Sequence, residues 1–236
     1  MPISGINGGY APGSGAPAVN AGKVKNSGIE LVLNYKDNIN DFKYDIGFNI
    51  TTINNEVLEV NNSTNYIEGG AFAIGQLPPT RMEVGQPIGV FYGLQTEGIF
   101  QNQAEINASP VQNLGSPTSP GDFKYKDVNG DGVVNFKDRT YIGKAIADYT
   151  LGFNINLNYK NFDFSFNLRA SLGNHIYNNI NSVSAYYSLV QNNTVLGNIP
   201  TSVLDTNFIQ PGSLGTQSDI YIENASFLRM DNITFG

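Results

Sequence analysis

The 236-residue sequence contains no cysteine. This absence excludes a disulfide framework, a thiolate metal site and a cysteine nucleophile. His175 is the single histidine, so a histidine metal cluster or a Ser-His-Asp triad would depend on that one residue. No stretch approaches the roughly 20 consecutive apolar residues that a membrane-spanning helix needs, which excludes insertion into a membrane as helices.

Charged residues are also scarce, at 14% of the chain, against about 25% in an average soluble domain. The formal net charge is −7 and Lys and Arg form no cluster, so the electrostatic footprint of nucleic-acid binding is missing. Asn, Gly, Ser and Thr, with many Tyr and Phe, take the place of charge and favour strands and turns over helices. The first residues lack the basic start and apolar core of a secretory signal. The chain is therefore expected to be either cytoplasmic or part of a longer protein.

Apolar and polar residues alternate in several segments with a period of two, which is typical of strands with two unlike faces. The clearest segments are residues 28–36, 42–52, 151–159 and 162–170. Polar turns at residues 37–41 and 160–161 predict that these four strands form two hairpins.

A last strand is predicted over residues 226–235, where the alternation changes phase. Leu228 and Met230 lie on one face, but the apolar positions then shift to Ile233 and Phe235. A β-bulge near Asp231 and Asn232 would explain the shift, because a bulge inserts one extra residue into a strand.

The remaining segments are rich in Gly, Asn, Pro and Ser. Residues 1–22 are predicted to be a flexible lead-in, followed by one β-structure over residues 23–236. Residues 54–149 and 173–225 interrupt the strands without clear patterning, and long unpatterned loops usually carry function or disorder.

The aromatic residues favour a membrane setting. Tyr35, Tyr44, Tyr159 and Phe162 flank the two short turns, as an interfacial girdle would. Apolar stripes of about nine residues at a tilt near 45° would span roughly 20–25 Å. We therefore predict an all-β fold, a segment of an antiparallel transmembrane β-barrel with short turns inside and long extracellular loops. The alternative is a secreted, calcium-stabilised β-sandwich that binds carbohydrate, with its polar faces in solvent.

Residues 127–138, within the predicted extracellular excursion of residues 54–149, match a twelve-residue calcium loop. Oxygen ligands would come from positions one, three, five, seven, nine and twelve, which are Asp127, Asn129, Asp131, the Val133 carbonyl, Asn135 and Asp138. Gly132 would permit the sharp turn. Asp138 stands where an EF-hand has Glu, as in the dockerin variant of the loop. The alternative is an Asn/Asp/Gly turn that needs no ion.

Other candidates are weaker. Tyr186 and Tyr187 could stack on a sugar, and carboxylates such as Glu97 and Glu105 could be offered as a glycosidase pair, but nothing fixes their separation. We therefore do not expect an enzyme.

Five segments together resemble the SusC/RagA family of TonB-dependent outer-membrane transporters. In chain order they are GKVKNSGIELVLNY, VGQPIGVFYGLQTEGIFQN, GDFKYKDVNGDGVVNFKDRTYIG, LGFNINLNYKNFDFSFNLRASLGNHIYN and IYIENASFLRMDNITFG. They cover most of the chain from Gly22 onward.

The resemblance implies that this chain holds late strands of a 22-stranded barrel, located in the bacterial outer membrane. It also implies import of a large nutrient, an oligosaccharide or a peptide, together with a SusD-like lipoprotein that covers the barrel. The family's plug and its contact with the TonB complex would lie in an N-terminal part that this sequence does not contain.

Overall fold

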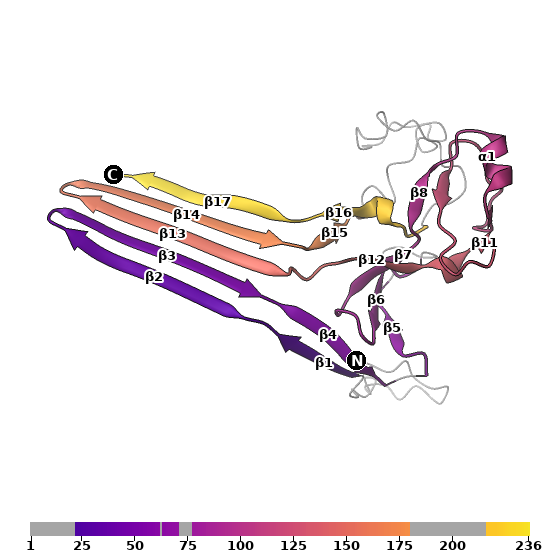
Figure 1. The fold of residues 1–236 in the computed structure, drawn as a ribbon, viewed down its shortest axis with the longest axis horizontal. Helices are drawn as coiled ribbons and strands as arrows, with labels where there is room; N and C mark the ends of the chain where they lie inside the picture. Colours follow the sequence, from indigo (N-terminus) through magenta and orange to yellow (C-terminus); the bar gives the residue numbers. More distant parts are fainter. Residues whose placement is uncertain (1–21, 62, 71–76, 180–215) are drawn as a thin grey trace, which may run out of the picture.

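A computed structural model describes residues 22–61, 63–70, 77–179 and 216–236. Within them, a long antiparallel sheet leads at one end into a folded region of short strands (Figure 1). The five strands of the long sheet, in the order in which they lie side by side, are β17 (Phe227–Phe235), β14 (Phe162–Leu172), β13 (Tyr149–Tyr159), β3 (Phe42–Thr52) and β2 (Glu30–Ile39).

The long sheet confirms the strands that the alternation predicts. β3 has the predicted bounds, and β13 and β14 each extend two residues beyond them. β2 begins two residues later than predicted and ends three residues later. Asn40 and Lys160 hold positive φ angles of 53° in the two hairpin turns. This left-handed conformation closes a tight turn between twisted strands.

The predicted bulge lies in β17. Met230 pairs with Leu168 and Asn232 pairs with Asn167, so Asp231 is an extra residue without an opposite partner. The residues beyond the bulge therefore return to the correct faces, with Ile233 opposite Phe166. The bulge therefore explains the phase change in the sequence.

The sheet has one apolar and one polar face, and both are accessible. On the apolar face Leu33 is 55% exposed and Leu228 is 73% exposed. Among the described residues no second sheet covers this face. The described part of the chain therefore does not form the β-sandwich of the alternative prediction, because a sandwich buries the apolar face of each sheet against the other.

Aromatic side chains gather at the turn end of the sheet, as predicted for a girdle. The ring centroids of Tyr35 and Tyr44 are 5.7 Å apart, and Phe42 lies 5.8 Å from Tyr44 and 6.4 Å from Tyr159. The opposite end of the sheet continues into β1 (Gly22–Ser27) and β4 (Asn54–Val60), which pair with each other. Residues 1–21 of the predicted flexible lead-in lie outside the described residues, whereas Gly22 begins β1.

Beyond that end lies a region that we call the head (Figure 1). Its elements are β5 (Tyr66–Glu68), β6 (Thr80–Glu83), β7 (Val90–Gly93), β8 (Thr96–Ile99), α1 (Gln103–Ala108), β9 (Val111–Gln112), β10 (Phe123–Tyr125), β11 (Val133–Val134), a 3₁₀ turn (Phe136–Asp138), β12 (Thr140–Lys144), β15 (His175–Tyr177), a second 3₁₀ turn (Asp219–Tyr221) and β16 (Ile222–Asn224).

The head contains the buried core of the described structure. One cluster consists of Leu94, Phe123, Tyr125 and Val134, and another of Phe91, Tyr177 and Tyr221. The second cluster joins the two long segments that interrupt the sheet. Residues 54–149, which show no clear pattern in the sequence, thus contain short strands that bury side chains without a readable period.

The segment before β16 packs against the chain between β7 and β8. Ser218 is fully buried and its backbone bridges to Leu94, while Asp219 accepts hydrogen bonds from the backbone and hydroxyl of Thr96. Gly93 allows this close approach, because a Cβ there would lie 2.6 Å from the Gln217 carbonyl oxygen. No helix in the described part of the chain is long and apolar enough to cross a membrane.

Candidate calcium loop and the arginine clasp

The predicted calcium loop, residues 127–138, lies in the head between β10 and β12 (Figure 1). Gly130 and Gly132 have φ angles of 75° and 85°, where a side chain would be strained. The glycine predicted for the sharp turn is therefore required by the backbone. All six predicted ligand residues lie in this loop, which hydrogen bonds from backbone N–H groups to Asp127 and Asp138 close.

The first half of the loop is a series of side-chain-to-backbone hydrogen bonds. Asp127 accepts from the N–H groups of Gly130 and Gly132, at 2.7 and 2.8 Å. Asn129 accepts from Asp131 N, and Asp131 accepts from Val133 N, both at 2.9 Å. Asn, Asp and Gly thus order the loop by ordinary turn chemistry.

Asp138 holds the two halves of the loop together. Its side chain is fully buried and accepts three backbone N–H groups, from Val128 at 3.0 Å, Asn129 at 3.2 Å and Asn135 at 2.8 Å. Three such donors stabilise a buried carboxylate. In this arrangement Asp138 closes the loop without presenting an outward pair of oxygens.

The remaining predicted ligands are partly engaged with each other. The Asn135 amide donates to the Val133 carbonyl at 3.0 Å, and Asn135 Oδ1 accepts from Lys137 N at 2.9 Å. Of the predicted ligand residues, Asn129 and Asp131 are exposed and Asp127 is partly exposed. In the described residues no group of three or more His, Cys, Asp or Glu side chains is gathered tightly enough to hold a metal. Calcium binding therefore stays a prediction, which fits best at the first three positions.

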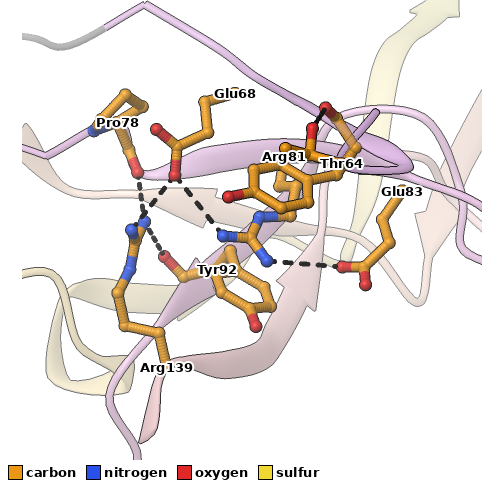
Figure 2. A network of polar contacts seen from close by, with 8 residues as sticks. Thr64, Glu68, Pro78, Arg81, Glu83, Tyr92 and Arg139 are labelled. Carbon is orange, nitrogen blue, oxygen red and sulfur yellow. Dashed lines mark hydrogen bonds and ion pairs between the residues drawn. The ribbon is translucent and has the colours of Figure 1, made fainter. Parts of the chain in front are cut away.

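A partly buried cluster that the sequence analysis missed begins at the next residue. We call Glu68, Arg81, Tyr92 and Arg139 the arginine clasp (Figure 2). Glu68 Oε1 lies between the two guanidinium groups, 3.4 Å from Arg81 and 3.3 Å from Arg139. Arg139 also donates to the Pro78 and Tyr92 carbonyl oxygens, at 2.6 and 3.2 Å.

Aromatic rings complete the clasp. The Arg81 guanidinium lies 3.8 Å from the ring centroid of Tyr66 and 3.6 Å from that of Tyr92, so ring quadrupoles help to stabilise its charge. Burial lowers the pKa of Arg139, and the neighbouring Glu68 carboxylate opposes this shift. Through Arg139, which follows the predicted calcium loop, the clasp connects the end of that loop to β5, β6 and β7.

Isolated arginines carry no periodic signal, which is why pattern reasoning missed the clasp. The only hint is that Arg139 directly follows the last position of the calcium loop. His175 packs its ring beside Gly143, and its buried Nδ1 makes no hydrogen bond within the described structure. Tyr186 and Tyr187 lie outside the described residues.

No protein-family model matches the chain. Comparisons with individual proteins find similarity to TonB-dependent receptors. TonB-dependent receptor SusC of Bacteroides thetaiotaomicron is 31% identical over 223 residues, which are 92% of this chain and 21% of SusC. TonB-dependent receptor P3 of Formosa agariphila is 28% identical over 230 residues, which are 92% of this chain and 22% of that receptor. This chain thus spans about a fifth of the length of these relatives.

Solved structures agree in fold. A chain of the RagAB peptide transporter matches 97% of this chain and 24% of its own length, with a TM-score of 0.64 and 18% sequence identity. The RagAB peptide importer in its "open-open" state matches with a TM-score of 0.61. At this identity the match supports the fold alone.

The relatives are TonB-dependent receptors, a class of proteins of the bacterial outer membrane. Within that class the chain is similar to the SusC and RagA group, so the resemblance carried by its sequence motifs is confirmed. The relatives are receptors and transporters rather than enzymes, in agreement with the sequence analysis.

Proposed function

We propose that this chain forms barrel wall and outer loops of a TonB-dependent transporter that imports a large nutrient, an oligosaccharide or a peptide, across the outer membrane. The observation that carries the proposal is the apolar face of the long sheet, which nothing in the described chain covers. Eleven-residue strands at about 3.3 Å per residue and a tilt near 45° would span roughly 25 Å, the height of an outer-membrane apolar band.

Nutrient uptake by cells that produce the full-length protein tests this function. We expect deletion of its gene, or of TonB, to abolish uptake of the same oligosaccharide or peptide mixture. Uptake that continues unchanged without TonB would contradict the proposal. A variant confined to the head, such as Glu97→Gln at an exposed position, is the matched control for production and membrane insertion.

We propose further that residues 127–138 bind one calcium ion, chiefly through Asp127, Asn129 and Asp131. The supporting features are the spacing of these residues, the exposure of Asn129 and Asp131, and the two left-handed glycines. The expected dissociation constant is roughly 10⁻⁴–10⁻³ M, as in extracellular calcium modules. Calorimetry on the full-length protein should detect binding heat that Asp131→Ala removes. Asp122→Ala, a carboxylate outside the loop, should leave that heat unchanged.

A SusD-like lipoprotein would dock against the surface around this loop. Three large apolar side chains support the proposal, since Val111, Val128 and Phe136 are each exposed on or beside the loop. A partner that covered them would bury apolar surface on binding. Substituting Asp127 and Asp131 together should loosen the loop and weaken association with the lipoprotein. Co-purification of the lipoprotein at wild-type levels would argue against this role.

A further inference from the structure

Two dipeptides in the loop of residues 127–138 are chemically labile. They are Asn129-Gly130 and Asp131-Gly132, and the second is the one Asp-Gly pair in the chain. In both, glycine follows the side chain, so no Cβ hinders attack of the next backbone nitrogen on the side-chain carbonyl carbon. All four residues are exposed. Water therefore reaches the place where such a reaction would occur.

Deamidation at an Asn-Gly pair follows a defined course. The Gly130 nitrogen would give up its proton and bond to Cγ of Asn129, and the Cγ–Nδ2 bond would break to release ammonia. Water then opens the resulting five-membered succinimide by breaking one of its two ring C–N bonds. One opening gives aspartate, and the other gives isoaspartate, in which the main chain runs through Cβ and Cγ. In sum, asparagine and water become an acid and ammonia.

The side-chain carbonyl of Asn129 is oriented in a way that favours this attack. Its Oδ1 accepts a hydrogen bond from the backbone N–H of Asp131 at 2.9 Å. A donor at a carbonyl oxygen stabilises the negative charge that develops there when a nucleophile bonds to the carbon. The electrophile is therefore prepared, and any protection of this pair has to act on the Gly130 nitrogen.

One carboxylate restrains both glycine nitrogens. Asp127 Oδ1 accepts the Gly130 N–H at 2.7 Å, and Asp127 Oδ2 accepts the Gly132 N–H at 2.8 Å. Each N–H must leave this charge-assisted hydrogen bond before its nitrogen can lose the proton. A nitrogen that became negative next to the carboxylate would also be repelled by it. Both effects slow formation of the succinimide.

We propose that Asn129-Gly130 is a latent deamidation site, which Asp127 keeps unreacted by holding the Gly130 N–H. Through Gly132, Asp127 protects Asp131 from isomerisation in the same way. The opposite role, a base that removes the N–H proton, does not suit Asp127, because a carboxylate is far too weak a base for an amide. Donor and acceptor are both protein groups, so the protection needs no bound ion. Deamidation would add one negative charge beside Asp127 and Asp131.

Peptide mass spectrometry of the full-length protein tests the site. Trypsin cleaves after Lys126 and Lys137, and the peptide between them contains both Asn129 and Asn135. Asn135 precedes the bulky Phe136, which makes it a slow internal reference. The protein is kept in detergent at mildly alkaline pH for several weeks, with calcium or with EGTA, and samples are digested at intervals. Chromatography separates the asparagine, aspartate and isoaspartate forms of the peptide.

We expect Asn129 to react much more slowly in the wild-type protein than in a synthetic peptide of residues 124–140, with calcium and with EGTA alike. Asp127→Ala should speed the reaction on the order of tenfold, because a hydrogen bond to a charged acceptor is lost. Asp127→Asn keeps one acceptor oxygen and should give an intermediate rate, also if Asp127→Ala fails to fold. The matched control is Asn135→Ala, which removes two other hydrogen bonds of the loop and should react at the wild-type rate.

Four results would overturn the proposal. Equal rates in wild type and synthetic peptide would mean that Asp127 protects nothing, and a slower reaction in Asp127→Ala would make its carboxylate the base. Loss of wild-type protection in EGTA would assign the protection to a bound ion. Equal acceleration in Asn135→Ala would mean that any loosening of the loop is enough. Calorimetry with Asp131→Ala decides the calcium site separately, so neither proposal depends on the other.

Discussion

The long sheet and the head use opposite means to hold their shape. In the sheet, backbone hydrogen bonding with a single bulge joins five strands, yet Gly47 is the one buried residue on them. In the head, strands of two to five residues surround buried aromatic clusters. The sheet therefore depends on its surroundings to cover its apolar face, whereas the head contains its own hydrophobic core. Substitutions in the two regions should therefore respond differently to detergent and lipid.

The largest effect is expected in the head core. Phe100 is 1% exposed, and Phe100→Ala should destabilise the head by about 3–5 kcal/mol, because it leaves a cavity. Leu228→Ala, on the exposed face of β17, should cost much less. Limited proteolysis of the full-length protein in detergent should show faster cleavage within residues 77–148 for Phe100→Ala only. If both variants resisted cleavage equally, the head would not depend on its buried core as we expect.

The next effect separates the two faces of the sheet. Leu33→Arg places a charge on the apolar face near mid-strand and should cost about 2–4 kcal/mol in a bilayer. Asn34→Arg, one residue along on the polar face, should cost little. Folding into lipid vesicles, followed by heat-modifiable gel mobility, measures the difference. If both variants folded equally well, the apolar face would not be the one that contacts lipid.

A smaller effect is expected at the arginine clasp. Glu68→Gln removes the carboxylate shared by Arg81 and Arg139 and should destabilise the head by about 1–3 kcal/mol, since buried donors lose a charged acceptor. Glu83→Gln is the control, because Glu83 makes one longer ion pair at 3.7 Å. Hydrogen exchange in β6 and β7 should quicken for Glu68→Gln alone. No change in exchange would mean that the clasp is dispensable.

The smallest effect is a pH dependence in the head. Burial raises the pKa of Asp122, and a backbone hydrogen bond from Ser119 opposes the shift. An acid whose pKa is higher in the folded state stabilises the fold when protonated. The contribution of Asp122 to head stability should therefore rise as pH falls through its folded pKa. Asp122→Asn should remove that contribution, so thermal melts recorded between pH 3 and 6 should show a steeper loss of stability on acidification in the variant than in wild type. Equal slopes in the two proteins would contradict the prediction.

The sequence predicted the sheet well because period-two alternation records two unlike environments on every strand. Even the bulge at Asp231 could be predicted, since one extra residue reverses the phase of everything after it. The head gave no such signal. Its strands are too short to show a period, and its core residues, such as Leu94 and Tyr221, come from distant parts of the chain.

The candidate site was predictable in part. Spacing within residues 127–138 located the loop and its turn glycine, because both follow from local chemistry. Spacing could not show that Asp138 would turn inward to bind backbone N–H groups, or that Arg139 would reach Glu68 across the head. Those contacts depend on which distant segments pack together.

The bulge in β17 has a consequence for how the length of this strand can vary. Arg169 and Arg229 stand directly opposite each other, and like charges in that position repel. Asp231, the extra residue, reaches both. A chain that lacked residue 231 would keep every later side chain on its present face but would lose the carboxylate between the arginines. In related chains we therefore expect a one-residue deletion here to be accompanied by replacement of one of the two arginines.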